Sequence, residues 1–337
     1  MRTYLLAFSF LFITHMLAAQ VTDTTAVDDF DYSKFGDAAG VKRYATQKVL
    51  NQTPNRIVSL AYEYQGAFDM PGVPSFPNQT YRVNRIAGIR GQLNIPVVSN
   101  TKLIWQLGAT YWRSGYNFAS ANSAFISKLN ANGMHTASLN TTFFKPLNEK
   151  NFLIFQASAD VNGVFEKFSD VNSKALTISA TAIYGWKKSE QNMYGVGVAR
   201  TYRAGQIIYV PVLLWNKTFN DQWGMELLLP ARGHLRRNFS TSNIVQLGYE
   251  LEGNQYWMRT PSPNGQVFIQ RGELKPRVMW DKKLSGFFWL NVQAGFRYNW
   301  RFDVMNEYDA RKDEKLFFRS ALTNTFYFSF GLNFVSP

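Results

Sequence analysis

Cysteine is missing from all 337 residues of the chain, and histidine occurs only three times. The missing cysteine excludes a disulfide scaffold, a cysteine zinc site and a thiol nucleophile. Charged residues make up only 18% of the chain, whereas aromatic residues reach 16%. Disordered segments are poor in aromatic residues, so most of the chain is expected to fold. The length accommodates one large domain, and a single barrel can use all of it.

The N-terminal stretch has the pattern of an export signal. Arg2 precedes an apolar run from Leu5 to Ile13, and small residues at 18–19 precede Gln20. The run is too short for a membrane anchor, which needs about 20 apolar residues. Residues 20–40 then carry five aspartates and one lysine without a sustained period. We therefore expect a signal peptide over 1–19, a flexible periplasmic leader over 20–55 and a folded domain over 56–337.

The remainder of the chain alternates between apolar and polar residues. The clearest stretch is 287–301, where Leu290 and Val292 fall on one face and Asn291 falls on the other. Period two is the signal of a β-strand with one apolar wall and one polar wall. Both a soluble β-sandwich and a transmembrane barrel alternate in this way, so periodicity alone does not separate them.

Strand length and the connections favour the transmembrane barrel. The alternating runs are about 10 to 16 residues long, whereas strands of globular proteins peak at about 5–6 and a membrane strand needs about 9–11. Short and long connections mostly alternate, as in barrels with short periplasmic turns and longer outer loops. Fourteen antiparallel strands are expected, or twelve if the short pair around Pro230 does not span. The expected strands are 56–66, 80–95, 102–113, 133–146, 151–163, 174–187, 192–203, 206–218, 223–230, 234–240, 244–256, 266–280, 286–302 and 324–335.

The chain resembles the outer-membrane β-barrels of Gram-negative bacteria over about residues 41–337. More narrowly, the segments Leu17–Gln20 and Glu226–Ser240 are similar to those of an uncharacterised barrel family of the Bacteroidota, a domain of unknown function. The family implies a location in the outer membrane and no activity. The last strand is also similar to the signal read by the barrel-assembly machinery, although Val335–Pro337 follow the final aromatic residue.

The sequence contains little that points to catalysis, to a metal or to a cofactor. Lipid-cleaving barrels pair a serine with a histidine, but His135 has the parity of the lipid-facing residues, whereas Ser138 points the other way. His234 lies among arginines without an evident serine partner. We therefore expect no enzyme, no metal site and no cofactor. The basic balance does not indicate nucleic-acid binding, because no aromatic and basic recognition motif is present. Outward cations such as Arg85 and Arg113 could instead contact lipopolysaccharide.

Charged residues on the polar parity are the candidate site. A charge facing lipid costs about 2–4 kcal/mol for arginine or lysine at mid-membrane, so these residues are expected to face the lumen. One interpretation is a salt-bridged interior that rigidifies the barrel; the other is a constriction that selects solutes. The candidates are Glu63, Arg82, Arg90, Glu226, Glu250, Glu252, Arg271, Glu273, Lys275, Arg277, Arg297 and Arg301.

The sequence is compatible with three functions. The first is passive passage of small or amphiphilic solutes through a partly plugged lumen. The second is a structural barrel that binds a partner or lipopolysaccharide without transport. The third, and least favoured, is a lipid-cleaving hydrolase. The sequence does not indicate which solute, if any, is carried.

Overall fold

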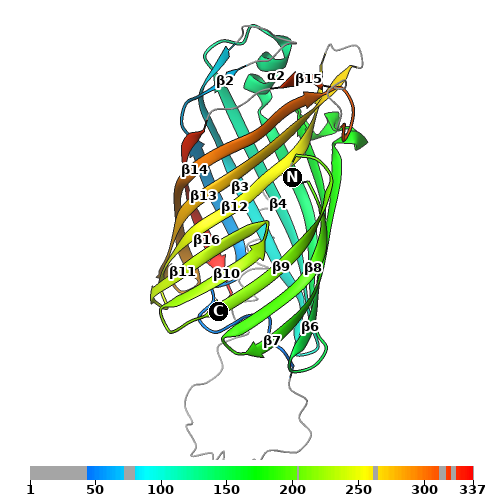
Figure 1. Cartoon of the computed structure of the whole chain (residues 1–337). Helices are drawn as coiled ribbons and strands as arrows, with labels where there is room; N and C mark the ends of the chain where they lie inside the picture. Colours follow the sequence, from blue (N-terminus) through cyan, green and yellow to red (C-terminus); the bar gives the residue numbers. More distant parts are fainter. Residues whose placement is uncertain are drawn as a thin grey trace, which may run out of the picture. The chain divides into compact units, whose positions relative to one another are not determined.

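The chain forms a closed antiparallel β-barrel (Figure 1). The computed structural model describes residues 44–71, 80–202, 205–260, 265–310, 316–319 and 324–336. The strands are β1 (Arg56–Gln65), β2 (Phe68–Pro71), β3 (Thr80–Asn100), β4 (Leu103–Phe118), β5 (Met134–Pro146), β6 (Asn151–Val164), β7 (Leu176–Ser189), β8 (Asn192–Thr201), β9 (Ile208–Thr218), β10 (Trp223–Leu229), β11 (Arg232–Ser240), β12 (Asn243–Arg259), β13 (Gln266–Ser285), β14 (Phe288–Met305), β15 (Leu316–Arg319) and β16 (Thr325–Val335). The helical elements are α2 (Ala124–Asn132) and the 3-10 turns η3 (Phe168–Asp170) and η4 (Ser173–Ala175).

The first and last strands close the barrel. Strand β1 pairs with β16 on one side and with β3 on the other, and the remaining strands follow in sequence order. Among the described residues the sheet has 16 strands, in which β2 pairs only with β3 and β15 pairs only with β14. Without these two short strands, 14 form the closed wall, which confirms the expected fold class and strand number.

The two faces of the wall have opposite character. Outward positions are apolar and open, as at Leu139, which is 70% exposed, and Tyr209, which is 71% exposed. Inward positions on the same strands carry polar groups, for example Asn140 next to Leu139. An apolar outer belt around a polar interior is the arrangement of a transmembrane β-barrel. Within the described ranges, no helix has the length and apolar character that crossing a membrane requires.

The barrel has two tiers. We call the end that carries α2, β2 and β15 the loop end, and the opposite end the turn end. At the loop end, β12 leaves its neighbour β11 and pairs in parallel with β6, through Trp257 with Gly163 and Met258 with Val164. Strands β7 to β11 therefore contribute to the wall only below this junction, and the wall is narrower above it.

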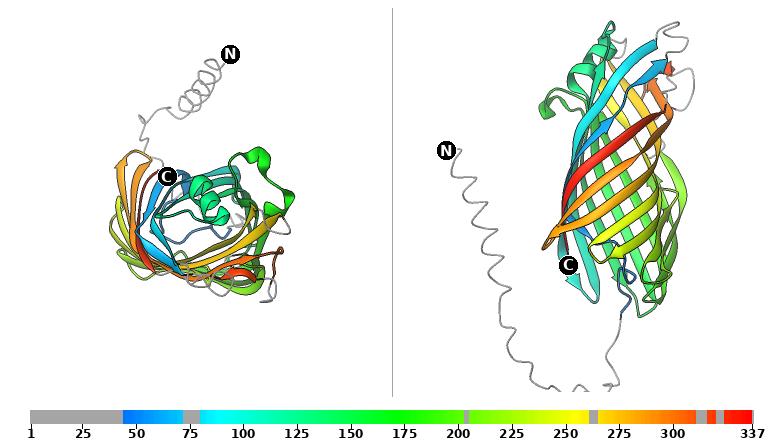
Figure 2. Two further views of the ribbon diagram at one scale, coloured as in Figure 1. Left: turned by 90° about the horizontal axis from the view of Figure 1, so that it is seen from above. Right: turned by 90° about the vertical axis from the view of Figure 1, so that its left-hand side faces the viewer.

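The interior of the loop end is filled by an apolar core. Helix α2 lies inside the rim in the view from above in Figure 2, and it buries Ile126 and Leu129. Around these two side chains pack inward residues of the neighbouring strands: Phe68, Met70, Tyr81, Val83, Ile86, Tyr116, Phe118, Met134, Val164, Tyr256, Met258, Val267, Ile269, Phe302 and Val304. This core closes the axis of the barrel at that end.

No helix is expected from the sequence, yet α2 forms within a long connection. Its nine residues are too few to be stable alone, since isolated helices shorter than about 12–15 residues are marginal in water. The side chain of Ser123 accepts a hydrogen bond from the Ile126 amide at 3.2 Å, which caps the first turn. Gly133 ends the helix with a φ of 74°, a conformation that glycine adopts without strain. Burial against the barrel interior supplies the remaining stabilisation.

Candidate functional site in the barrel interior

A network of buried ion pairs crosses the middle of the interior on one side. Glu63 of β1 accepts from Lys275 of β13 at 3.1 Å and from Arg297 of β14. Lys275 also binds Glu252 of β12 at 3.0 Å, and Glu252 in turn binds Arg90 of β3. Opposite charges therefore alternate across five strands, so each buried charge has a partner, as burial in a low-dielectric interior requires.

The network continues toward the loop end through Glu273. Its carboxylate lies 2.5 Å from Arg271 and 2.5 Å from Arg297. The ring of Trp112 lies against the same cations, with the Arg90 guanidinium 4.5 Å and the Arg271 guanidinium 5.4 Å from its centroid. An indole face attracts such cations, more strongly when water is excluded. The ion-pair network with Trp112 is thus a packed body, and the interior is filled on this side.

Three further ion pairs lie nearer the turn end. Arg277 binds Glu250 at 2.7 Å, Arg236 binds Glu226 at 3.3 Å, and Arg56 binds Asp281 at 3.1 Å. Arg236 is fully buried and is not among the residues that the sequence predicts to face the lumen. Arg236 lies two residues after His234, so both side chains are on the same, inner face of β11. This alternation is the sequence signal that identifies Arg236 as an interior residue.

Two of the candidate residues do not face the lumen. Arg82 pairs with Asp69 at 3.0 Å at the loop end, and both side chains are well exposed, at 51% and 44%. A register shift between Val83 and Arg85 reverses the strand parity between Arg82 and Arg90. If alternate residues are counted from Arg90 back through this bulge, Arg82 is assigned to the inner face, which is wrong.

Arg301 is displaced by the same mechanism. The register of β13 and β14 skips one residue, because Gly272 pairs with Arg301 whereas Glu273 pairs with Asn299. Trp300 is the extra residue, and Arg301 pairs with Asp303 at 3.0 Å. The other candidates, from Glu63 to Arg297, all take part in interior ion pairs.

Residues 44–55 are docked inside the turn end, and we call them the docked segment (Figure 2). The amide and hydroxyl of Thr53 donate to the Glu226 carboxylate at 3.1 Å and 2.7 Å. The Leu50 amide donates to the Glu190 carbonyl at 2.8 Å, and Thr218 donates to the Leu50 carbonyl at 2.5 Å. This part of the expected leader is therefore held by the barrel, whereas residues 1–43 lie outside the described residues.

Apolar and cationic contacts hold the same segment. Ala45 and Val49 are buried in one cluster with inward residues of β5 to β9: Phe144, Phe152, Ile183, Met193, Ala199, Val212 and Leu214. The buried Lys187 donates to the Lys48 carbonyl at 3.0 Å and to Thr46. Such burial is favourable by about 25 cal/mol per Å² of apolar surface, so the docked segment is a part of the fold and not a free linker.

A cavity of about 520 Å³ remains between these fillings. Its wall includes hydroxyl and amide groups of strands β4 to β9 and, from the ion-pair network, Arg90, Trp112 and Glu252. Ala199 and Val212 form part of its floor and belong to the cluster that holds the docked segment. The uncharged polar lining includes Gln92, Thr110, Thr136, Ser138, Asn140, Thr141, Thr142, Gln156, Ser158, Ser179, Thr181, Thr201 and Asn254. The charged lining residues are Arg90, Asp160, Arg200, Arg232, Glu250 and Glu252. Such a lining can hydrogen-bond an uncharged polar group in many orientations.

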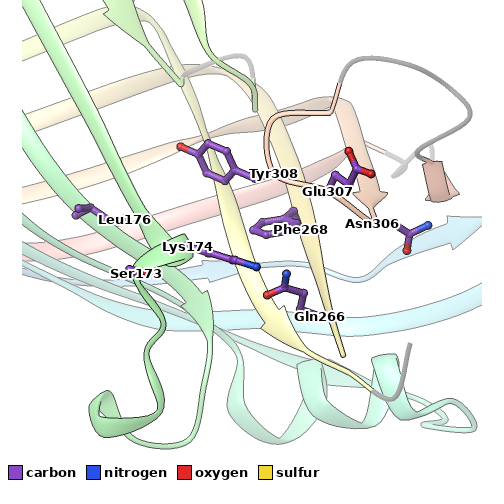
Figure 3. Close-up of a pocket in the computed structure, with 8 residues that line it drawn as sticks. All are labelled: Ser173, Lys174, Leu176, Gln266, Phe268, Asn306, Glu307 and Tyr308. Carbon is purple, nitrogen blue, oxygen red and sulfur yellow. The ribbon is translucent and has the colours of Figure 1, made fainter. Parts of the chain in front are cut away.

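A second hollow of about 420 Å³ lies on the outer surface near the loop end (Figure 3). Lys174 and Leu176 approach it from η4 and β7, and Glu307 and Tyr308 approach it from the loop after β14. Phe268 lies at its base, in a small apolar cluster with Trp257. This hollow does not share residues with the interior cavity.

Within the described part of the chain, neither His135 nor His234 is arranged for catalysis with a serine. His135 lies within hydrogen-bond distance of the Tyr111 hydroxyl at 2.9 Å and of the Asn132 carbonyl at 3.0 Å. Ser138 faces the interior and donates to Asp160. His234 is buried near the Arg277–Glu250 pair. In the part of the chain that the structure describes, no group of three histidine, aspartate or glutamate residues could hold a metal ion.

Among solved structures, the chain is similar to a FadL homologue from Pseudomonas aeruginosa, at 10% identity and a TM-score of 0.42, covering 83% of this chain and 90% of that chain. It is also similar to the toluene transporter TodX from Pseudomonas putida, at 9% identity and a TM-score of 0.33, covering 85% and 92%. The β-domain of the Bordetella autotransporter BrkA matches at 11% identity and a TM-score of 0.30, covering 84% and 100%. These likenesses concern the fold alone.

No curated protein sequence matches the chain. The family model described as "Domain of unknown function (DUF6268)" matches residues 87–335, and the chain belongs to that family.

Proposed function

We propose that the protein is an outer-membrane barrel that takes small amphiphilic solutes into its interior and passes them to the periplasm when the docked segment is displaced. The cavity of about 520 Å³ carries this proposal, because it is lined by hydrogen-bonding groups and lies directly above the cluster that holds Val49. A barrel with a purely structural role gains nothing from a polar cavity of this size, since protein interiors otherwise pack to high density.

The docked segment is suited to be the barrier on the periplasmic side. Its polar anchors, Thr53 to Glu226 and Leu50 to Glu190, are individual hydrogen bonds, each with a net worth of about 0.5–1.5 kcal/mol, or about 1.5–3 kcal/mol for a charged partner. The wall of the barrel, in contrast, is a continuous ladder around the full circumference. The segment can therefore leave while the wall stays intact.

Planar-bilayer conductance tests the proposal with two matched truncations. A chain without residues 20–53 loses the docked segment, whereas a chain without residues 20–43 keeps it. We expect open levels that are larger or more frequent in the first truncation, and behaviour like the full mature chain in the second. If neither protein opens, the rival function, a structural or partner-binding barrel, replaces passage.

A further inference from the structure

The wall of the barrel is interrupted above the β10–β11 hairpin. On the edge that faces away from β13, strand β12 pairs with β11 as far as Glu250. On the same edge it pairs with β6 from Trp257 onward. On the other side, β9 pairs with β10 from Leu213 onward, so residues 208–212 pair only with β8. Among the described residues, no strand joins β9 to β12 across this interval. Figure 1 shows the hairpin ending well below the upper rim, with β12 passing above it.

The interior cavity extends through this interruption. Its lining includes inward residues such as Asn140 and Thr181, which lie opposite on the inner wall. The same cavity is lined by Leu251 and Gly253 of β12 and by Trp300 of β14, which have outward parity. A single hollow that contacts both faces of the wall is an opening in it.

On the outer side the hollow reaches Gly253 of β12 and Trp300 of β14, and we call this part of it the groove. Gly253 pairs directly with Gly272, so two adjacent positions lack side chains. The Trp300 indole lies over Gly272, where an added Cβ would be 2.5 Å from its Nε1. The bulge in β14 places this indole there, since Trp300 is the residue that the register skips. Glycine in a strand commonly marks such a close approach.

The outer surface beside the opening is largely apolar, and the outward Arg200 of β8 also lines the hollow. Ile178 of β7, Val198 of β8 and Tyr209 of β9 are all more than half exposed on the outer face. Toward the loop end, the hydroxyls of Tyr202 and Tyr308 lie 2.8 Å apart and close the gap between the β8–β9 connection and the loop after β14. The opening therefore lies beside the apolar outer belt, with Arg200 and the β8–β9 connection at its border.

We propose that this opening is a lateral port between the bilayer and the interior cavity, and that it admits single-chain amphiphiles with an uncharged polar head. This inference rests on the proposed function and gives its entry route and its solute class. The tail would lie in the groove over Gly253 and beside Trp300, and the head would bind the hydroxyl and amide groups within. Three cations, Arg90, Arg200 and Arg232, and three carboxylates, Asp160, Glu250 and Glu252, line the cavity. Arg90 is bound to Glu252, and the equal number of charges of each sign favours a neutral head over an anionic one.

Cysteine labelling in liposomes tests the port, because the natural chain has no cysteine. The Thr181→Cys variant places a thiol on the inner wall of the cavity. N-dodecylmaleimide, which partitions into the bilayer, should label this thiol readily. Adding Gly253→Trp fills the groove and should slow the labelling at least tenfold. The matched control is Gly91→Trp on β3, an outward position where an added Cβ meets nothing within 4 Å.

A second variant and a second reagent keep the test decisive. Trp300→Ala widens the groove without adding bulk, and it should speed labelling by N-dodecylmaleimide. A charged, membrane-impermeant maleimide should be unaffected by either change. Equal rates of N-dodecylmaleimide labelling in all variants would overturn the port. Conductance through the turn end does not depend on the groove. If labelling shows no port but the truncated chain still conducts, the port is rejected and the proposed passage through the turn end still stands.

Discussion

The guanidinium of Arg297 on β14 binds the carboxylate of Glu63 on β1 across the intervening strand β16, although 234 residues separate them in the chain. The contact therefore spans the seam where the last strand meets the first. Arg297 also binds Glu273, so one buried cation neutralises two carboxylates. The ion-pair network is thus tied to closure of the barrel.

Removing the Arg297 guanidinium should destabilise the barrel strongly. Arg297→Met leaves Glu63 with Lys275 alone, and Glu273 with Arg271 alone. Breaking a buried pair from one side typically costs about 3–5 kcal/mol. We expect a loss of this size in the free energy of unfolding, measured by urea titration in lipid vesicles with tryptophan fluorescence.

The matched control for that measurement is Arg82→Ala. Its ion pair with Asp69 is exposed on both sides. Exposed pairs contribute about 0–1 kcal/mol, so the free energy of unfolding should change by no more than that. Equal losses in Arg297→Met and Arg82→Ala would show that burial of the network carries no stability.

These two arginines also show how far the sequence determines the site. Alternation identified the strands because lipid and lumen impose opposite demands on successive side chains. It placed Arg297 correctly, since no bulge lies between it and its neighbours toward the turn end. It failed at Arg82 and Arg301, where a single extra residue reverses the parity. Bulges depend on the pairing partner, and no local pattern in this chain reveals them.

The docked segment shows a second limit. Residues 44–55 have no strand or helix period, so they read as the end of a linker. Their order comes from partners far away in the chain, such as Glu226, which is 173 residues from Thr53. The opening above the β10–β11 hairpin is similar. The short strands were visible in the sequence, but the β6–β12 junction that leaves the gap was not.

Thr53→Val should loosen the docked segment. The change removes the hydroxyl that donates to Glu226 at 2.7 Å and keeps the shape of the side chain. A hydrogen bond to a charged group is worth about 1.5–3 kcal/mol, so release of the segment should become at least tenfold more frequent. Hydrogen exchange of the Leu50 amide, which is bonded to Glu190, measures this release.

A comparable hydrogen bond at the loop end supplies the control. Ser123→Ala removes the cap of α2 and should leave the exchange rate of Leu50 unchanged, because α2 lies at the loop end and the docked segment at the turn end. If the two variants accelerate exchange equally, the Thr53 anchor has no specific role.

Docking of the segment should strengthen as pH rises from 8 toward 10.5. Burial lowers the pKa of Lys48 to about 8, and this effect outweighs the Glu226 carboxylate, which raises it. The released segment regains the ordinary pKa of 10.5. The released form therefore binds the extra proton between these two values, and the docked form gains stability there as pH rises.

Cleavage of the segment by subtilisin measures this pH dependence, with unfolded casein as the reference for the activity of the protease. Relative cleavage should be slower at about pH 9.5 than at about pH 7.5. The Lys48→Met variant, which has no group to titrate at this position, should show no such trend. A trend of the same size in Lys48→Met would assign the effect to another group.

The central claim is that the apolar flank of each strand touches acyl chains and the polar flank encloses the interior. Spin labels on Leu139→Cys and Asn140→Cys test it at adjacent positions of β5, since Leu139 is 70% exposed on the outside and Asn140 lines the cavity. In vesicles, oxygen dissolved in the bilayer should enhance relaxation of the label at residue 139, and a water-soluble nickel complex should not. The label at residue 140 should not show this combination of responses. Equal responses at both positions, or a response at residue 139 to the nickel complex, would contradict the account.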